Sequence, residues 1–457
     1  MAVVTPIVPP TRRNVELALL LLAVAVAGGA YAIVGLSVQG ALPQDLWLIS
    51  GGLGLMVLVV HVVLRLRAPY ADPVLLPVAT VVNGLGLVVI HRLDLAHHFH
   101  GATSLATRQL VWSAIGVACA VAVLVAVRDH RVLARYTYLA MIAGFGVLLL
   151  PLLPVVGRQV NGARIWIGLG PLSFQPGEIA KILLALFFAG YLVTARDSLS
   201  LVGRKVLGLQ LPRGRHLGPI LVAWLASLGV LVFERDLGTS LLFFGLFVAV
   251  LYVATERISW IVIGLSLFAG GAVLAWTLFS HVQVRVAIWL HPFDAKNADI
   301  AFQPIQAWFG MASGGLMGSG LGQGRPDLVP FAQSDFIVAA FGEELGLTGL
   351  FALLVLYAML VERGLRTAVG ARDGFGKLLA AGLAFSIALQ VFVVVGGVTR
   401  LIPLTGLTAP FMAYGGSSLV SNWVVVALLM RISDSARRPP DSVAPPVTAE
   451  VAAVVGS

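Results

Sequence analysis

Residues 217–257 read LGPILVAWLASLGVLVFERDLGTSLLFFGLFVAVLYVATER, and this stretch decides the fold class. Two long apolar runs flank the charged residues Glu234, Arg235 and Asp236. Each run has about the 17–25 residues that an α-helix needs to cross a hydrocarbon core. Unpaired backbone cannot face lipid, and the runs lack the alternating pattern of a membrane β-barrel. The stretch therefore predicts two membrane-spanning helices joined by a very short charged turn.

The rest of the chain repeats this pattern. Of its 457 residues, 59% are hydrophobic and only 11% are charged, whereas soluble proteins carry roughly a quarter charged residues. We therefore expect an all-α polytopic membrane protein, a bundle of about 12 transmembrane helices. The expected spans are about 15–36, 46–66, 73–91, 108–127, 134–154, 178–194, 217–233, 237–254, 258–279, 335–361, 377–398 and 408–430.

The net charge of +9 has two interpretations, a nucleic-acid partner or cytoplasmic loops rich in Lys and Arg. Loop by loop, the basic residues alternate strongly, and 20 of the 30 fall on one side of the predicted topology. This favours the membrane interpretation, without nucleic acid, and places both termini in the cytoplasm. The tail 434–457 lacks helical patterning and is expected to be disordered.

Two further features bear on the cellular context. The first span follows Arg12 and Arg13 and contains Ala30-Tyr31-Ala32, a motif compatible with signal-peptide cleavage. The apolar run continues past this motif, which favours a retained helix instead. Cys119 is the only cysteine, so the chain cannot form an internal disulfide or a thiolate metal site.

Charged residues at membrane depth are costly and often mark function. Asp236 lies at the start of a predicted helix, where a carboxylate is favoured by unpaired backbone amides. It is therefore a simple helix cap or a functional carboxylate. Glu178 and Lys181 lie three residues apart on one helix face, so they form a structural ion pair or part of a binding site.

Two long segments on the outer side carry other candidates. The first contains Arg158, Arg164 and Trp166, where guanidinium groups suit phosphate and the indole suits either a ligand or the membrane interface. The second, about residues 280–334, has a glycine-rich part before Arg325 that we expect to be flexible and able to cradle a phosphate with its backbone amides. Near the C-terminus, Ser417 and Ser418 follow two glycines, which indicates close packing or a broken helix lining a cavity.

Six segments, taken in order, resemble the SEDS family of RodA and FtsW. They are NGARIWIGLG, QPGEIAK, ERDLGTSLLFFGLFVAVLYVATER, GSGLGQG, SDFIVAAFGEELG and IPLTGLTAPFMAYGGSSLVSNW. The likeness covers about residues 75–433, and the last segment is closer to the RodA branch. Gly177, Ala413 and the pair Gln333-Ser334 depart from residues common in the family, but no charged position is lost.

The resemblance implies a family core of ten spans and its activity. Residues 1–72 would then form two extra helices, and 73–433 a glycosyltransferase core that polymerises lipid II outside the membrane with a class B penicillin-binding protein. Asp236 would act as the base on the acceptor hydroxyl while undecaprenyl pyrophosphate leaves. We assign Arg158, Arg164, Trp166, Glu178, Lys181, Ser417 and Ser418 to substrate binding. A divalent cation on the pyrophosphate is compatible with this chemistry, although no His/Cys cluster indicates a metal site.

Two other functions remain open. A transporter of the lipid-linked precursor would also have many spans and buried charges, but it needs charges along a path on both sides of the membrane. The candidate charges cluster on the outer side instead. A non-catalytic scaffold would tolerate replacement of Asp236.

Overall fold

The structure is a computed structural model that describes residues 11–439 except 100, 155, 161–162, 170–171, 201, 207–208 and 213–217. The predicted tail 434–457 starts too early, because α14 continues to Arg437, and its residues beyond 439 lie outside the described residues, as do Asn161 and Gly162. The long helices are α1 (Arg13–Gln39), α2 (Leu46–Arg67), α3 (Leu75–Ala96), α4 (Leu105–Ala126), α5 (Thr137–Leu149), α6 (Pro176–Ser200), α7 (Gly218–Phe233), α8 (Leu237–Thr255), α9 (Ile258–Leu278), α10 (Ser280–Leu290), α11 (Ala298–Gly314), α12 (Ile337–Gly370), α13 (Gly374–Val398) and α14 (Gly416–Arg437).

In the described part of the chain, 11 helical segments are long and apolar enough to cross a membrane. They match eleven of the twelve expected spans, with α5 extended by short 3-10 turns on either side. The remaining expected span corresponds to α7, which has 16 residues in the structure. The predicted all-α polytopic fold is confirmed.

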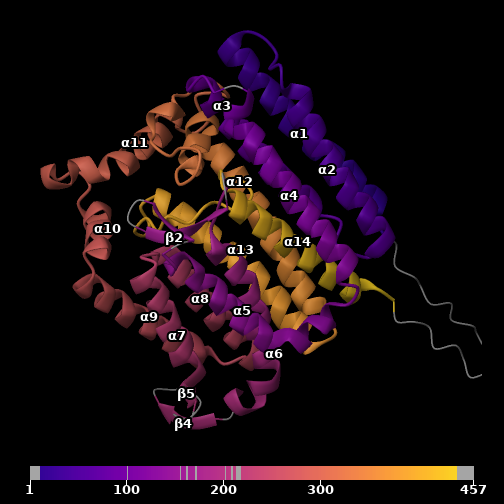
Figure 1. The fold of residues 1–457 in the computed structure, drawn as a ribbon, viewed down its shortest axis with the longest axis vertical. Coiled ribbons are helices and arrows are strands. Elements are labelled where there is room, and N and C mark those ends of the chain that lie inside the picture. The colour runs from indigo at the N-terminus through magenta and orange to yellow at the C-terminus, as the bar shows by residue number, and fades with distance from the viewer. Residues whose placement is uncertain are drawn as a thin grey trace, which may run out of the picture.

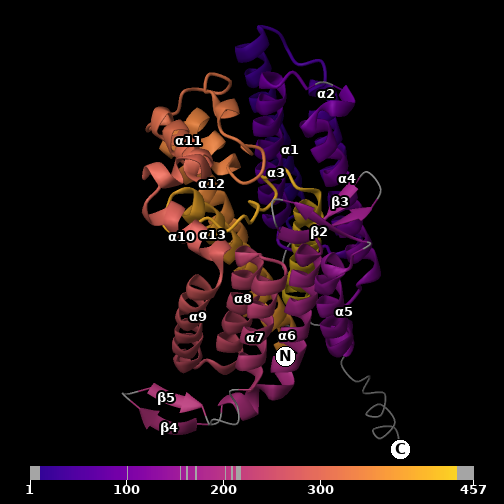
Figure 2. The same ribbon diagram turned by 60° about the vertical axis from the view of Figure 1, so that its left-hand side comes forward.

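The helices form one bundle whose centre is built by α3, α13 and α14 (Figures 1 and 2). Between 72% and 89% of the most apolar window of each of these helices is buried, against 28% for α1. Helix α13 packs against α12, α6 and α8, while α14 packs against α4. The central helices thus bring polar residues from distant parts of the sequence into one protected interior.

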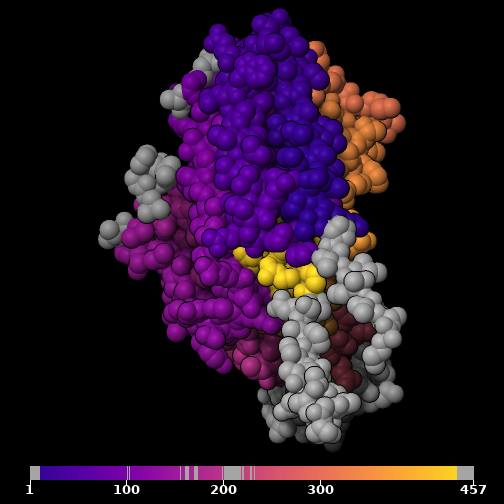
Figure 3. Space-filling model, turned by 90° about the vertical axis from the view of Figure 1, so that its right-hand side faces the viewer, coloured from indigo at the N-terminus to yellow at the C-terminus, as the bar shows by residue number. Residues whose placement is uncertain are grey.

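Helices α1 and α2 cover the upper part of the face shown in Figure 3. They pack on α3 and α4, and α1 approaches α3 closely at Gly84, where an added Cβ atom would lie 2.5 Å from the Cβ of Ala27. At one end, Arg13 donates a hydrogen bond to the carbonyl of Ala71, and Arg437 pairs with Asp72. The first helix therefore begins on the same face of the bundle on which the last helix ends.

The connections carry more structure than the sequence predicts. Strands β1 (Gly157–Val160), β2 (Ala163–Leu169) and β3 (Leu172–Phe174) form an antiparallel sheet after α5. A second hairpin, β4 (Val202–Val206) and β5 (Leu209–Pro212), lies at the opposite end of the bundle (Figures 1 and 2). The long outer segment contains α10 and α11, and the short 3-10 turns are Gly101–Thr103, His130–Tyr136, Leu150–Leu152, Ala295–Asn297 and Pro326–Leu328.

The expected span 408–430 begins later than predicted, because α14 starts at Gly416. Residues 402–415 form a non-helical segment, named the extended segment below, which turns at residues 410–412, and Gly406 has a φ of 83°. Its carbonyls accept hydrogen bonds from side chains of four helices. These bonds are Arg285 to Leu404 (2.6 Å), Gln390 to Thr408 (2.9 Å), Tyr357 to Pro410 (2.7 Å) and Gln109 to Ala413 (3.0 Å). Side chains replace the helical hydrogen bonds, so the backbone stays paired without a helix.

Candidate functional site

The turn between α7 and α8 holds Asp236. Arg235 adopts a left-handed conformation with a φ of 59°, which reverses the chain within two residues. Asp236 then caps α8: one carboxylate oxygen accepts from the Thr239 amide at 3.0 Å and the other from the Thr239 hydroxyl at 2.6 Å. Asp236 is only 7% exposed. The predicted cap is therefore present, and it fixes the direction of a buried carboxylate.

Burial controls the protonation of the two carboxyl groups in this turn. It raises the pKa of Asp236 above its usual value, against the hydrogen bonds from Thr239 and the charge of Arg285. Burial, and then the nearby charge of Asp236, raise the pKa of Glu234 to about 8. At neutral pH, Glu234 therefore keeps its proton. The charge of Arg285 opposes the rise in the pKa of Asp236. Buried carboxyl groups with shifted pKa values are typical of acid–base sites.

Arg285 completes the site, and our sequence analysis missed it. It comes from α10, donates to the Leu404 carbonyl, and its charge acts on both Asp236 and Asp335. Burial lowers the pKa of Arg285 and raises that of Asp335. The available signal was a lone cation in the apolar stretch 282–290, but its nearness to Asp236 depends on how α10 folds back over the bundle.

Glu178 and Lys181 form the expected pair on α6, with 2.8 Å between the Lys181 Nζ and the carboxylate. Lys181 is 1% exposed and also donates to the Gln390 side chain of α13 at 3.0 Å. The Gln390 amide in turn donates to the Thr408 carbonyl. Lys181 is thus a buried side chain whose hydrogen bonds connect α6 to α13 and, through Gln390, to the extended segment 402–415.

The first outer segment lies beside the Asp236 turn. The backbone amide of Arg164 donates to the Glu234 carbonyl at 3.3 Å, which ties β2 to the end of α7. Arg158 and Arg164 are exposed, Trp166 is half-buried, and Arg158 stands opposite Trp166 in the β1–β2 register. The hairpin therefore lies against the end of α7 and carries two exposed cations.

Ser417 and Ser418 lie in the first turn of α14 and are buried. The Ser418 hydroxyl accepts from Asn422 at 3.2 Å, one turn along the same helix. The contact between this helix and the Glu178 region is made by Ser421, whose hydroxyl donates to the Glu178 carbonyl at 2.8 Å. The structure therefore places these serines in helix packing near α6, and Asn422 supplies the polar partner of Ser418.

The glycine-rich stretch is held in place, and the expectation of flexibility was wrong. The amides of Ser319 and Gly320 donate to the carbonyls of Glu343 and Glu344 at 3.0 and 2.9 Å. The stretch thus fastens to the start of α12, whose helix breaks at Gly346 with a φ of 66°. These two amides are occupied, so they do not form a phosphate cradle.

No group of three or more His, Cys, Asp or Glu side chains arranged for a metal ion occurs in the described residues. Two carboxyl groups of the site, those of Asp236 and Asp335, are close enough for their charges to act on Arg285. A divalent cation would have to share this space with a guanidinium group.

Comparison with known proteins places the chain among cell-envelope proteins. A family model described as "Cell cycle protein", covering FtsW, RodA and SpoVE, matches residues 73–438. The peptidoglycan glycosyltransferase RodA of Mycobacterium bovis is 51% identical over 447 residues, covering 96% of this chain and 94% of that protein.

Two solved structures share the fold. A chain from a peptidoglycan synthase complex, studied for the coordination of polymerisation and crosslinking, has a TM-score of 0.63 and 28% identity, and the match covers 80% of this chain and 98% of that one. RodA of Thermus thermophilus has a TM-score of 0.57 and 26% identity, with 81% and 98% covered.

Proposed function

We propose, from the premise that this chain belongs to the FtsW, RodA and SpoVE family, that it is a peptidoglycan glycosyltransferase that polymerises lipid II. The observation that carries the proposal is the buried carboxylate of Asp236. It is fixed as a helix cap and interacts electrostatically with Arg285. A raised pKa makes this group a stronger base, and the nearby cation favours its ionised form.

The reaction follows from the roles of these groups. Asp236 takes the proton of the GlcNAc 4-hydroxyl of the acceptor. The freed oxygen forms a bond to C1 of the donor sugar with inversion, while the C1–O bond to phosphate breaks and its electron pair leaves with undecaprenyl pyrophosphate. Arg285 would stabilise this charge, and the exposed hairpin cations Arg158 and Arg164 would bind other phosphate groups of the substrates. We assign Lys181 to shaping the cavity, because its ammonium is already bonded to Glu178 and Gln390.

The orientation and partner belong to the same proposal. The distribution of basic loops puts the face with the inner ends of α1 and α14 in the cytoplasm and Asp236 outside. A lipid-linked substrate explains why the catalyst is a multi-pass membrane protein. The relative in the synthase complex supports a partner that crosslinks the new strand, which we propose is a class B penicillin-binding protein.

The Asp236→Asn variant tests the assignment, because Asn caps a helix about as well as Asp but is not a base. We expect glycan-strand formation from lipid II by the purified protein to fall on the order of 10²–10⁴-fold. The matched control is Asp373→Asn, which changes another Asp helix cap, at the start of α13, and should retain near-normal activity. Near-normal polymerisation by Asp236→Asn would refute the role of the base and favour a scaffold or a transporter.

A further inference from the structure

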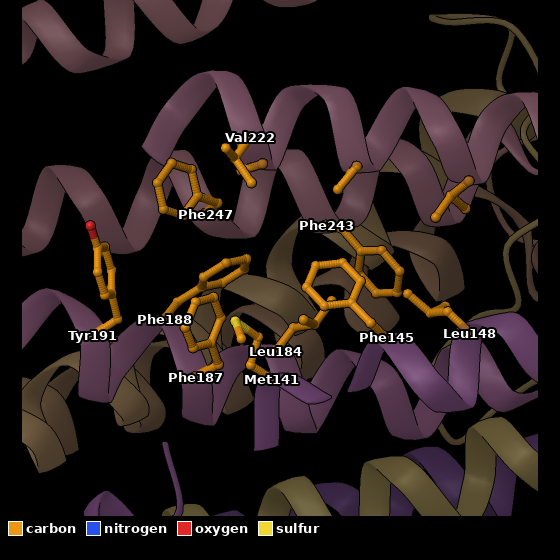
Figure 4. A pocket seen from close by; sticks show the side chains of 13 residues that line it. Met141, Phe145, Leu148, Leu184, Phe187, Phe188, Tyr191, Val222, Phe243 and Phe247 are labelled. Carbon is orange, nitrogen blue, oxygen red and sulfur yellow. The ribbon is translucent and has the colours of Figure 1, made fainter. Parts of the chain in front are cut away.

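Two separate apolar clefts flank the α7–α8 hairpin. The α9 cleft, of about 510 Å³, is lined by residues from α7 to α10, α13 and the extended segment, including Leu237, Ser240 and Arg285. The α5 cleft, of about 280 Å³, lies between α5, α6, α7 and α8. Figure 4 shows its aromatic side chains in a row along the helices, from Tyr191 to Phe145. The hairpin that carries Asp236 therefore separates two cavities.

Both clefts open on the sides of the bundle. Phe392, which lines the α9 cleft, is 52% exposed, and Val222, which lines the α5 cleft, is 64% exposed. In a membrane these sides face hydrocarbon chains. The fitting occupant of such a cleft is a long hydrocarbon tail that enters from the bilayer, and the polar ends of the clefts indicate which one.

The two clefts differ in their distance from Asp236. The α9 cleft includes Leu237 and Ser240 in the first turn of α8, and it has the Arg285 guanidinium at this end. The part of α8 that lines the α5 cleft begins at Phe243, seven residues after Asp236 and so roughly 10 Å deeper along the helix. The exposed Arg158 and Arg164 lie on the sheet that follows α5.

The reaction also requires one pyrophosphate to lie closer to Asp236 than the other. In the donor, the pyrophosphate is bonded directly to the carbon that reacts. In the acceptor, a whole disaccharide separates the pyrophosphate from the attacking hydroxyl. The donor pyrophosphate must therefore lie beside Asp236, whereas the acceptor pyrophosphate lies two sugar rings away.

We propose that the α9 cleft binds the prenyl chain of the donor with its pyrophosphate on Arg285, and that the α5 cleft binds the prenyl chain of the acceptor, with its pyrophosphate near Arg158 and Arg164. This assignment rests on the proposed function. In this assignment, the α7–α8 hairpin separates the prenyl chains of the two substrates. Their sugars meet at Asp236, at the outer end of the hairpin. Separate clefts let both tails stay in the bilayer throughout the reaction.

Two lipid II analogues separate the two roles. An analogue without the GlcNAc 4-hydroxyl can donate but not accept, and one with a methylene group in place of the C1–O oxygen can accept but not donate. We would measure the KM of each analogue in a single coupling, with the full-length protein in lipid nanodiscs. Ala272→Trp fills the α9 cleft and Ala226→Trp fills the α5 cleft. The neighbours Val273→Trp and Leu225→Trp face outward, line neither cleft and serve as matched controls.

We expect Ala272→Trp to raise the KM of the donor analogue alone, and Ala226→Trp that of the acceptor analogue alone. Each increase should be about tenfold, the effect of excluding roughly two methylene groups. The controls should match the wild type. The reversed pattern, equal effects on both analogues, or no effect would each overturn the assignment.

Photo-crosslinking of the same analogues gives a second measurement that does not need turnover. Labelling of the donor analogue should be lost in Ala272→Trp and retained in Asp236→Asn. If the wild type makes no coupled product, the proposed function fails, and the crosslinking pattern still decides which cleft binds which analogue.

Discussion

At the scale of single residues, the site depends on two buried carboxyl groups whose pKa values are raised and whose neighbours differ. Asp236 and Glu234 are both buried in one turn, yet only Asp236 has the Thr239 hydrogen bonds and the charge of Arg285. The ionised form of Asp236 in turn favours the protonated form of Glu234. Asp236 therefore serves both as the helix cap and as the proposed base, and the neighbouring Glu234 is protonated at neutral pH.

Glu234 should make the stability of the protein depend on pH. Its folded-state pKa of about 8 lies above the ordinary value of 4.5, so the stability it contributes is present below pH 4.5 and is lost as pH rises through 8. Glu234→Gln cannot ionise and should lose this dependence. We expect the Tm of the wild type to fall relative to that of the variant between about pH 4.5 and 8, and the two curves to run parallel below about pH 4 and above about pH 9.

The exposed Glu256→Gln is the control for this measurement and should follow the wild type at every pH. Parallel Tm curves for the wild type and Glu234→Gln across the whole range would show that Glu234 is not held protonated in the folded protein.

Sequence reasoning reaches Asp236 and stops short of Arg285. A cap depends on residues within one turn, so the spacing from Asp236 to Thr239 suffices to predict it. The proximity of Arg285 to Asp236 depends instead on α10 packing near the start of α8, between residues 49 positions apart in the sequence.

At the scale of elements, the buried Lys181 side chain connects parts of the chain that lie far apart in the sequence. It joins α6 to α13, and Gln390 continues the connection to the extended segment. Breaking a buried ion pair on one side leaves the other charge without compensation, which costs about 3–5 kcal/mol. The position of these three elements around the cavity should therefore depend on the pair as a unit.

We expect Lys181→Ala to be less stable and less active than the double variant Glu178→Gln, Lys181→Met, which leaves no unpaired charge. The measurements are Tm and glycan-strand formation by the purified proteins. Two variants that are equally inactive and both well folded would show that Lys181 itself binds the pyrophosphate. Glu178→Gln alone is the matching control for the opposite half of the pair.

The elements that sequence predicts well are the uninterrupted apolar spans. Hydropathy locates α8 and α9 within a few residues, because these spans are mostly apolar and contain no charged residue. It does not find α10 and α11, which are helices outside the expected spans, or the late start of α14. There the backbone is paired by distant side chains such as Gln390 and Tyr357, which leave no periodic signal.

At the scale of the whole molecule, the proposed function depends on which end of the bundle faces the outside of the cell. The start of α1 and the end of α14 meet at the segment around Asp72, so both lie on one face. The β1–β3 sheet and the glycine-rich stretch lie towards the other end, away from the β4–β5 hairpin (Figure 2). The chemistry proposed for Asp236 requires this other end to face the outside of the cell.

Cysteine labelling of intact cells tests this orientation, after the native Cys119 has been replaced. A membrane-impermeant thiol reagent should label Gln159→Cys and Met317→Cys in intact cells. It should label Val369→Cys only after the membrane is opened, because the basic loops on that side are expected in the cytoplasm. All three positions are exposed, so access to the reagent depends on the side of the membrane alone. The opposite pattern would overturn the proposed outer active site.

The extended segment 402–415 has a consequence for the evolution of the chain. Its carbonyls meet donors on α4, α10, α12 and α13 at set intervals, and the Tyr414 amide meets the Gln333 carbonyl at 2.8 Å. Inserting or deleting one residue would shift every later carbonyl away from its donor, leaving several unpaired at membrane depth. Descendants of this protein can thus exchange side chains here, while the number of residues in the segment remains constrained.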